Sequence, residues 1–395
     1  MKDLSEALAL VLDGIEPLPA ERVALVEGAG RVLAADARAV VDLPPFDRTA
    51  MDGYALRAAD SGAPLRVAGD LAAGDAGETP LEPGTAVRIS TGAPLPPGAD
   101  AILRVEDATV SNGSVTAAAP IAPGLHVRVR GEDLHAGDVL ARAGDRMTLP
   151  RLSALSAAGV GEVEVHRMPR LSLIVTGSEL LAPGAPPEPG KIYESNGLAI
   201  GFMARRNGGF LIQRPPIGDD AQATLAAVEQ GLESDVLVVS GGVSVGPHDH
   251  VKPAFEAAGV EEVFWRVRIK PGKPLWFGRR GRTLVFGLPG NPLSSIVGMA
   301  LFVIPALKRL AGERDARPWL ERGRLGGPAG PSDGRTTFLT SKFIPAADGV
   351  LEAFPTERQG SHMTGALGES DGFAVAPHGS GPLPAGAEVD LLRLG

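Results

Sequence analysis

The chain has 395 residues, of which 44% are apolar and 22% charged, and its formal net charge at pH 7 is −9. The length predicts two to four domains, and the acidic balance argues against a general nucleic-acid binder. No cysteine is present, which excludes disulfides, thiolate metal sites and cysteine nucleophiles. The first residues, MKDLSEALAL, lack the basic region and long apolar run of a signal peptide, so we expect a cytoplasmic protein.

The N-terminal part predicts a helix followed by a β-rich segment. Apolar side chains recur at helical spacing over residues 3–13, which indicates a short amphipathic helix. Short β-like pieces separated by Gly-Pro turns over residues 54–145 predict a small β-rich domain. Residues 148–160 return to a helical pattern, with Thr148 as the expected N-cap and Pro150 in the first turn.

Strand-like and helix-like patterns alternate between residues 168 and 312. The continuous apolar runs LSLIVTG and DVLVVS indicate strands covered on both faces, and the segments after them indicate helices capped by Ser195 or Asn196 and by Asp219. This alternation predicts βαβ units and a doubly wound, mostly parallel sheet. The apolar segment LSSIVGMALFVIPALKRL contains Pro305, and we interpret it as a buried helix rather than a membrane span. The remaining C-terminal pieces predict a small barrel or sandwich.

Polar segments follow the predicted strands of the α/β region. In open parallel sheets, ligands bind beyond the carboxyl ends of the strands. Four segments that carry glycine or carboxylate are expected there: residues 176–180, 218–220, 240–249 and 287–292.

The segment SGGVSVGPHD, residues 240–249, allows more than one chemistry. It contains a G-x-S-x-G pattern around Ser244, but the strand is expected to end at Ser240, too early for a nucleophile elbow. Gly241 and Gly242 let backbone amides approach a phosphate. No standard nucleotide fingerprint accompanies them, so a plain strand-to-helix turn remains equally open.

The end of this segment carries a carboxylate between two histidines. His248 and His250 are two residues apart, a spacing that would point them away from each other on a helix, which argues against a zinc site. Asp249 could hold a hard cation or could cap the following helix.

Two lysines stand around a Pro-Gly turn in RIKPGKPLWFG. The chain has 7 lysines against 31 arginines, so Lys270 and Lys273 indicate a place where a compact ammonium contacts a phosphate or oxyanion. The alternative is a solvated turn. Polar residues of the β-rich segment, Asp52, Thr91 and Asp133, read by themselves as solvated loop residues.

Eight stretches occur in the order typical of one family. They are PPFDRTAMDGYA, RISTGAPLPPGADAI, GEDLHAGDVL, IVTGSEL, PGKIYESNG, SGGVSVGPHD, IKPGKP and GLPGNPLSS. Through these stretches the chain resembles the molybdopterin molybdenumtransferase (MoeA) family, which includes the E domain of gephyrin, over essentially its whole length.

The resemblance implies a reaction and an assembly. Members insert molybdate into adenylylated molybdopterin and release AMP, with Mg²⁺ as the usual divalent cation. They are elongated homodimers with an active site between the α/β domain of one subunit and the β-rich arm of the other. Candidate protein partners are the molybdopterin adenylyltransferase and molybdoenzyme chaperones; nucleic acid and membrane are not expected partners.

The resemblance also implies a division into four domains. The expected fold is α/β multidomain, with a doubly wound molybdopterin-binding domain, a β-rich arm, an N-terminal connecting helical domain and a small C-terminal β-barrel. The expected boundaries are 1–45 with 143–167 for the connecting and dimerisation domain, 46–142 for the arm, 168–315 for the α/β domain and 316–395 for the barrel.

The family's functional positions fall on particular residues of this chain. The implied catalytic residues are Asp52, Glu179, Asp219, Asp249, Lys270 and Lys273. Of these, Asp249, Asp219 and Glu179 are the implied metal ligands. The implied substrate-binding residues are Thr91, Asp133, Ser240, Gly241, Gly242, Ser244, Pro289, Gly290, Asn291, Pro292 and Ser361.

Four residues depart from the family's usual pattern. Arg48 and Thr49 replace Asn and Ser, and Ser178 replaces a common Asp. Thr340 stands where the family places an arginine associated with the oxyanion, a role that Arg335 or Lys342 could take over. A carrier or scaffold without turnover, or an enzyme that handles tungstate, are the alternatives to a molybdate transferase.

Overall fold

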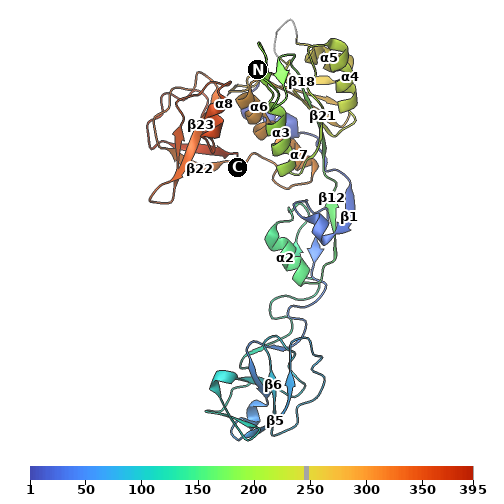
Figure 1. The fold of residues 1–395 in the computed structure, drawn as a ribbon, viewed down its shortest axis with the longest axis vertical. Helices are drawn as coiled ribbons and strands as arrows, with labels where there is room; N and C mark the ends of the chain where they lie inside the picture. Colours follow the sequence, from blue (N-terminus) through green and yellow to red (C-terminus); the bar gives the residue numbers. More distant parts are fainter. Residues whose placement is uncertain (244–248, 395) are drawn as a thin grey trace.

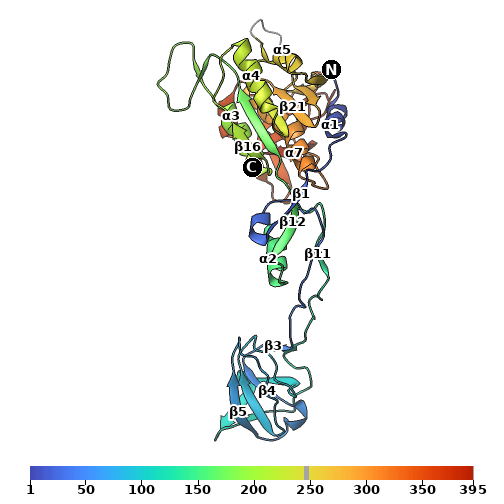
Figure 2. The same cartoon turned by 90° about the vertical axis from the view of Figure 1, so that its right-hand side faces the viewer.

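The protein is elongated, with its domains arranged along one long axis (Figure 1, Figure 2). The computed structural model describes residues 1–243 and 249–394. An α/β domain and a C-terminal barrel lie side by side at one end, and a β-rich arm lies at the other. A smaller connecting unit joins the two ends.

The α/β domain is built on a six-stranded mixed sheet. Four neighbouring strands are parallel and two antiparallel strands complete one edge. In spatial order the strands are β16 (Phe210–Gln213), β13 (Arg170–Val175), β17 (Val236–Ser240), β21 (Thr283–Leu288), β20 (Trp276–Arg280) and β18 (Glu261–Trp265).

Alternate residues of the central strands enter two different cores. In β17, Val236 and Val238 pack into one core and Leu237 and Val239 into the other. Side chains of a strand point to opposite faces in turn, so a strand covered on both faces reads as a continuous apolar run. This confirms the interpretation of DVLVVS.

Helices cover both faces of the sheet. Those on the first face are α1 (Leu4–Leu12), α3 (Asn196–Arg206), α6 (Pro292–Gly298) and α7 (Ile304–Leu310). Those on the second face are α4 (Ala221–Gly231) and α5 (Val251–Ala257). The doubly wound arrangement is thereby confirmed.

The most apolar segment forms a core helix. It runs continuously over Pro292–Leu310, from α6 through a π-helical turn at Met299–Val303 into α7. The helix has the length and hydropathy of a membrane span, but 83% of its apolar window is buried inside the protein. A buried core helix passes the same test of length and composition, and the packing assigns this one to the core.

The arm is a six-stranded sheet with its own small cores. In spatial order its strands are β7 (Ala101–Arg104), β4 (Gly53–Leu56), β6 (Thr85–Ile89), β5 (Leu65–Leu71), β9 (Ser114–Ala117) and β8 (Ala108–Ser111). A short pair, β3 (Arg48–Thr49) and β10 (Val127–Arg128), lies beside this sheet.

The connecting unit is assembled from chain segments on both sides of the arm. Its strand pairs are β1 (Ala20–Ala24) with β12 (Glu162–His166) and β2 (Ala37–Arg38) with β11 (Val139–Ala141). Helix α2 (Leu149–Ala157) packs on them. Thr148 is its N-cap residue, as expected, although its side chain makes no capping hydrogen bond.

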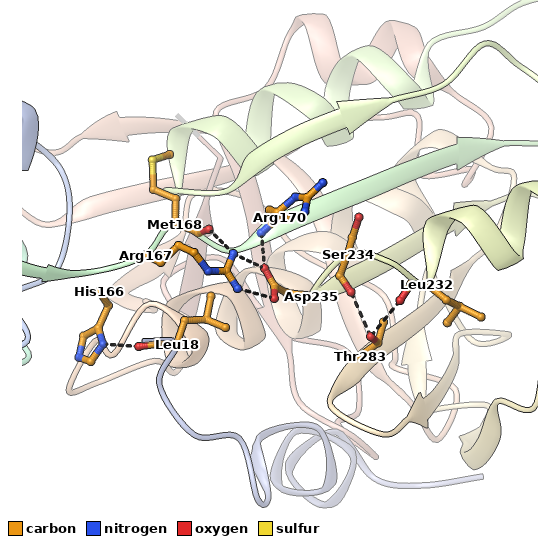
Figure 3. Close-up of polar contacts among 9 residues, drawn as sticks. All are labelled: Leu18, His166, Arg167, Met168, Arg170, Leu232, Ser234, Asp235 and Thr283. Atoms are coloured by element: carbon orange, nitrogen blue, oxygen red, sulfur yellow. Dashed lines mark hydrogen bonds and ion pairs between the residues drawn. The ribbon is translucent and has the colours of Figure 1, made fainter. Parts of the chain in front are cut away.

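Asp235 ties the connecting unit to the amino end of the sheet (Figure 3). Its carboxylate accepts hydrogen bonds from both terminal nitrogens of Arg167, at 2.9 and 2.8 Å, and from the Arg170 backbone at 2.7 Å. These bonds raise the pKa of the Arg167 guanidinium. Next to this pair, a ring N–H of His166 donates to the Leu18 carbonyl. The junction therefore joins the segment before β1, at Leu18, to the segment after β12, which continues into the α/β sheet.

The C-terminal domain is a closed barrel. The additional pairing of β23 with β25 closes a ring of five strands. The strands, preceded by β19 (Ile269–Lys270) at the edge, are β23 (Thr336–Pro345), β24 (Leu351–Pro355), β22 (Glu321–Leu325), β26 (Glu388–Arg393) and β25 (Gly372–Ala376). The fold class predicted from the sequence is confirmed, and the barrel, rather than the sandwich, is the C-terminal form.

One predicted cap was wrong. The N-cap of α4 is Asp220, whose carboxylate accepts from the Ala223 backbone at 2.7 Å, and not Asp219. Two neighbouring aspartates match the sequence pattern of a helix N-cap, and only the path of the chain decides which one caps α4. The carboxylate of Asp219 is therefore not used in capping.

Candidate functional site

A cleft of about 800 Å³ opens at the carboxyl ends of β13, β17 and β21. This is the position at which open parallel sheets bind ligands. Its lining consists of Val175, Thr176, Gly177, Glu179, Leu180, Ile192, Tyr193, Glu194, Ser195, Asn196, Asp219, Ser240, Gly241, Gly242, Asp249, Gly290, Asn291, Pro292, His362 and Thr364.

Of the residues implied by the resemblance, nine line this cleft. They are Glu179, Asp219, Asp249, Ser240, Gly241, Gly242, Gly290, Asn291 and Pro292. All four polar segments expected at the strand ends therefore meet in one place. Ser244 lies outside the described residues, so its implied role in substrate binding stays a prediction.

The loop after β17 needs glycine at its first position. Gly241 has φ +102°, and a Cβ there would lie 2.6 Å from the Thr176 carbonyl oxygen. Its backbone N–H donates to the Leu288 carbonyl at 3.0 Å, which holds the loop against β21. Any larger residue would combine a strained backbone with a clash.

A buried polar network lies beneath the two glycine loops. The Asn196 amide donates to Ser240 Oγ at 3.0 Å and to the Gly290 carbonyl at 2.8 Å. Ser240 Oγ lies 3.4 Å from Ser295 Oγ, and that hydroxyl donates to the Pro289 carbonyl. The network joins the start of α3, the end of β17 and the loop before α6.

The C-terminal barrel closes one side of the cleft. Ser361 accepts from the Asn291 side chain at 3.1 Å, and its carbonyl accepts from the Leu293 backbone at 3.3 Å. His362 and Thr364, just before and at the start of helix α8 (Thr364–Gly368), line the cavity. The family resemblance implies a binding role for Ser361, and the structure adds these two neighbours to the lining.

Four carboxylates line the cleft, and its described lining contains no lysine or arginine. They are Glu179, Glu194, Asp219 and Asp249. The described residues contain no group of three or more His, Asp or Glu side chains close enough to hold a metal ion. Asp219, Asp249 and Glu179 therefore present carboxylate oxygens to the cleft but form no complete metal centre by themselves.

Asp219, in the lining of the cleft, is held in place by hydrogen bonds with Ser178. Its backbone N–H donates to Ser178 Oγ at 2.8 Å, and the Ser178 N–H donates to its carboxylate at 3.2 Å. Lys191 donates to the Ser178 carbonyl at 2.5 Å. Ser178, which replaces the family's common Asp, thus orients Asp219 without adding a negative charge.

The two lysines lie beside the cleft rather than in its lining. Lys270 forms an ion pair with Asp333 at 3.1 Å, and both side chains are about half exposed. A Cβ at Gly272, within the same turn, would lie 3.6 Å from the Ser294 carbonyl of α6. The turn is therefore adjacent to the helix that begins at the cleft.

Asp52 and Thr91 contact each other in the arm. The Asp52 carboxylate accepts from the Thr91 backbone at 2.6 Å and from Thr91 Oγ1 at 2.8 Å. The backbone bond first, and the hydroxyl bond second, lower the pKa of Asp52. Strand β4, which follows Asp52, lies at the far end of the molecule from the cleft (Figure 2), and Asp133 also lies outside the cleft lining.

Thr340 does not face the cleft. It is 1% exposed and lies on β23, on the same face as Phe338, which packs into the α/β core rather than into the barrel core. Its backbone exchanges hydrogen bonds with the Gln359 side chain at 3.0 Å each. Neither Arg335 nor Lys342 lines the cavity. Within this chain, the barrel contributes His362 and Thr364 to the lining instead of a lysine or arginine.

Further lining residues are not predicted from the sequence because they do not follow a strand that the sequence predicts. Glu194, Ser195 and Asn196 stand immediately before or at the start of α3, in the stretch PGKIYESNG. That stretch supported the family resemblance, but a helix cap was the only role expected there. A carboxylate directly before a predicted helix cap, Glu194 before Ser195, is the available signal.

Comparison with known proteins gives matches along nearly the whole chain. Residues 2–159 match the MoeA N-terminal region (domain I and II), residues 172–309 a probable molybdopterin binding domain, and residues 322–394 the MoeA C-terminal region (domain IV). The cleft described above lies mostly within the second of these regions.

Curated relatives and a solved structure agree with these matches. The molybdopterin molybdenumtransferase of Haemophilus influenzae is 32% identical over 99% of this chain and 98% of its own. Molybdopterin molybdenumtransferase 2 of Mycobacterium tuberculosis is 38% identical over 80% of this chain and 81% of its own. A molybdopterin biosynthesis MoeA protein from Pyrococcus horikosii superposes with a TM-score of 0.83 at 33% identity, covering 100% of this chain and 99% of that one.

The fold and the cleft define a multidomain protein that carries a ligand-binding α/β domain of the molybdopterin-binding type. The regions that hold the arm, the connecting unit and the C-terminal barrel match the N-terminal and C-terminal regions of MoeA proteins. The chain belongs to the MoeA family.

Proposed function

We propose that this chain is a molybdopterin molybdenumtransferase, an enzyme of molybdenum cofactor biosynthesis. The observation that carries the proposal is the cleft at the carboxyl ends of the parallel strands, in the region that matches a molybdopterin-binding domain. Its curated relatives over most of their length bear that enzyme's name. We further propose that the substrates are molybdate and adenylylated molybdopterin and that AMP is released.

The charge of the cleft supports a divalent cation in this reaction. Molybdate and a pyrophosphate are both anionic, yet the described lining has four carboxylates and no lysine or arginine. Mg²⁺ prefers oxygen ligands, and sites of this kind combine one or two carboxylates with substrate phosphates and waters. The donor set of Asp219, Asp249 and Glu179 fits such an ion, which would neutralise phosphate charge when bound.

The remaining residues bind and orient the substrate under this proposal. The backbone around Gly241, Gly242 and Gly290 has no side chains that would keep a phosphate at a distance. Asn291 is oriented by Ser361 of the barrel. Lys270 and Lys273 stand beside the cleft, where an ammonium can contact an oxyanion that extends beyond it.

A homodimer is part of the proposal because the arm cannot complete the cleft of its own subunit. Strand β6, which ends two residues before Thr91, lies at the opposite end of the molecule from the α/β domain that holds the cleft (Figure 1), and Thr91 contacts Asp52. A second copy that lies alongside could bring that pair to the site. We also propose a cytoplasmic location, and the molybdopterin adenylyltransferase and molybdoenzyme chaperones as protein partners.

The test is an AMP-release assay with the purified full chain. Adenylylated molybdopterin, molybdate and Mg²⁺ are supplied together, and AMP and assembled cofactor are quantified. AMP release that requires both molybdate and Mg²⁺ is the expected result. Tight binding of the pterin without AMP release would instead assign the chain as a carrier or scaffold. Faster AMP release with tungstate than with molybdate would identify tungstate as the preferred oxyanion substrate.

A further inference from the structure

Glu194 is a buried carboxyl group in the cleft with unused hydrogen-bonding capacity. It is 8% exposed and lines the cavity. Its Oε1 accepts from the Gly197 backbone at 2.6 Å, and a Cβ at Gly197 would lie 2.9 Å from Oε2. Among the described residues, Oε2 accepts no hydrogen bond and forms no ion pair. Glycine at 197 leaves room for this carboxyl group, which retains a free acceptor.

Two neighbouring polar atoms of the cleft lining are also without partners. Asn196 Oδ1 and Thr176 Oγ1 are buried and have no hydrogen-bond partner in the described structure. The orientation of the Asn196 amide is settled, because its nitrogen faces the Gly290 carbonyl, which can only accept. Buried polar groups are almost always satisfied in native proteins, so both atoms retain hydrogen-bonding capacity. Asn196 stands two residues after Glu194 at the start of α3, whereas Thr176 Oγ1 lies beside the glycine loop, 2.7 Å from the position of a Cβ at Gly241.

We propose that Glu194 binds the amidine edge of the substrate's pterin ring, formed by its N3–H and 2-amino groups. This inference rests on the proposed function, because it takes the pterin from that reaction. The pterin edge presents two adjacent N–H donors, which match the two acceptor oxygens or lone pairs of one carboxylate. The edge of adenine alternates a donor with an acceptor, so a carboxylate would meet one favourable and one repulsive contact.

The rest of the cleft agrees with a flat ring at this end. Ile192 and Tyr193, directly before Glu194, are 59% and 47% exposed and also line the cavity, so apolar and aromatic surface adjoins the carboxyl group. The volume of about 800 Å³ lies within the range of small-molecule sites. A ring bound by Glu194 leaves the glycine loops at Gly241 and Gly290 for the phosphates.

The decisive variant is Glu194→Gln. Its amide oxygen can still accept from Gly197, so the contact at the start of α3 is preserved, while its NH₂ group opposes the donors of the pterin edge. The probes are pterin-6-carboxylate and lumazine-6-carboxylate, which differ in that an acceptor oxygen replaces the 2-amino donor. Binding to the full chain is followed by quenching of probe fluorescence.

We expect the wild-type protein to prefer the pterin by about 10-fold to 100-fold, the range for charge-assisted hydrogen bonds, and Glu194→Gln to lose this preference. Glu188→Gln, the same substitution on the exposed loop that precedes β15 (Ile192–Tyr193), is the matched control and should keep it. If Glu194→Gln unfolds, Glu194→Asp withdraws the carboxylate by one methylene, and it should also weaken the preference.

The AMP-release assay separates this inference from the proposed function. In that assay Glu194→Gln should raise KM for adenylylated molybdopterin about 10-fold or more with kcat nearly unchanged, as expected for lost binding. Wild-type AMP release together with an unchanged pterin preference in Glu194→Gln would overturn the role of Glu194 and leave the function standing. A wild-type protein that neither binds the pterin nor releases AMP would overturn both.

Discussion

The contacts of Asp235 allow one effect on stability to be worked out in detail. Its side chain is 18% exposed and accepts three hydrogen bonds, two from Arg167 and one from the Arg170 backbone (Figure 3). In Asp235→Asn the charge is lost, and the new NH₂ group faces donors on at least one side. Removing one partner of a largely buried pair costs about 3–5 kcal/mol. Because Arg167 is 36% exposed, water recovers part of this, and we expect about 2–3 kcal/mol.

The assay is thermal unfolding followed by tryptophan fluorescence. Trp276 is 3% exposed and lies in the core of the α/β domain, so its emission reports this domain rather than the arm. For a domain of this size, 1 kcal/mol corresponds to roughly 2–4 °C, so Asp235→Asn should lower Tm by about 4–12 °C. The steady-state rate of AMP release below Tm should be retained, because Asp235 precedes β17 while the cleft lies beyond its other end.

The matched control is Asp315→Asn. Asp315 bonds Arg317 only two residues away, which lowers the pKa of its carboxyl to about 2, but its side chain is 65% exposed. A local, exposed contact of this kind contributes little to folding, so Tm should not change measurably. An equal Tm shift in both variants, or none in Asp235→Asn, would refute the reasoning that burial and long-range bonding set the cost.

Three further predictions concern the site. Asp249→Asn should fold normally but lose Mg²⁺-dependent AMP release, and unchanged release would remove Asp249 from the metal ligands. Thr91→Val should raise the pKa of Asp52 toward its ordinary value of 3.8, since one of its two hydrogen bonds is lost; an NMR titration would detect this, with Thr91→Ser as the control. Because the folded pKa is the lower one, the contribution of this pair to stability is present above about pH 4, is lost as the pH falls through the folded pKa, and should be smaller in Thr91→Val. Gly241→Ala should lower stability by roughly 2 kcal/mol or more and slow AMP release, because of its positive φ and its 2.6 Å approach to Thr176; urea unfolding equal to wild type would contradict this.

Local patterns in the sequence were sufficient for several helices and strands. The apolar runs at β13 and β17 of the α/β domain, and the helical spacing at α1 and at α2 of the connecting unit, are properties of neighbouring residues, because periodicity records which faces are covered. The position of the cleft also followed, since parallel strands bring their carboxyl ends to one edge. The functional residues themselves came from the family resemblance rather than from periodicity.

Contacts between distant segments were decided only by the tertiary structure. Asp219 and Asp220 carry the same local signal, and only the approach of Ser178 separates the orienting contact of one from the capping role of the other. Thr340 is buried on the face of β23 that also carries Phe338 of the α/β core, whereas His362 reaches the cleft, and both positions depend on how the barrel packs against the α/β domain.

The sequence by itself determined the order of the elements, the buried strands and the glycine positions in the loops after the strands. These depend on side-chain size, polarity and spacing along the chain. The tertiary structure alone decided which buried polar atoms are left without partners, Thr176 Oγ1 and Asn196 Oδ1 among them. Whether an acceptor is satisfied depends on every group packed around it. Around Asn196 these groups come from α3, β17 and the loop before α6, which are distant in the sequence.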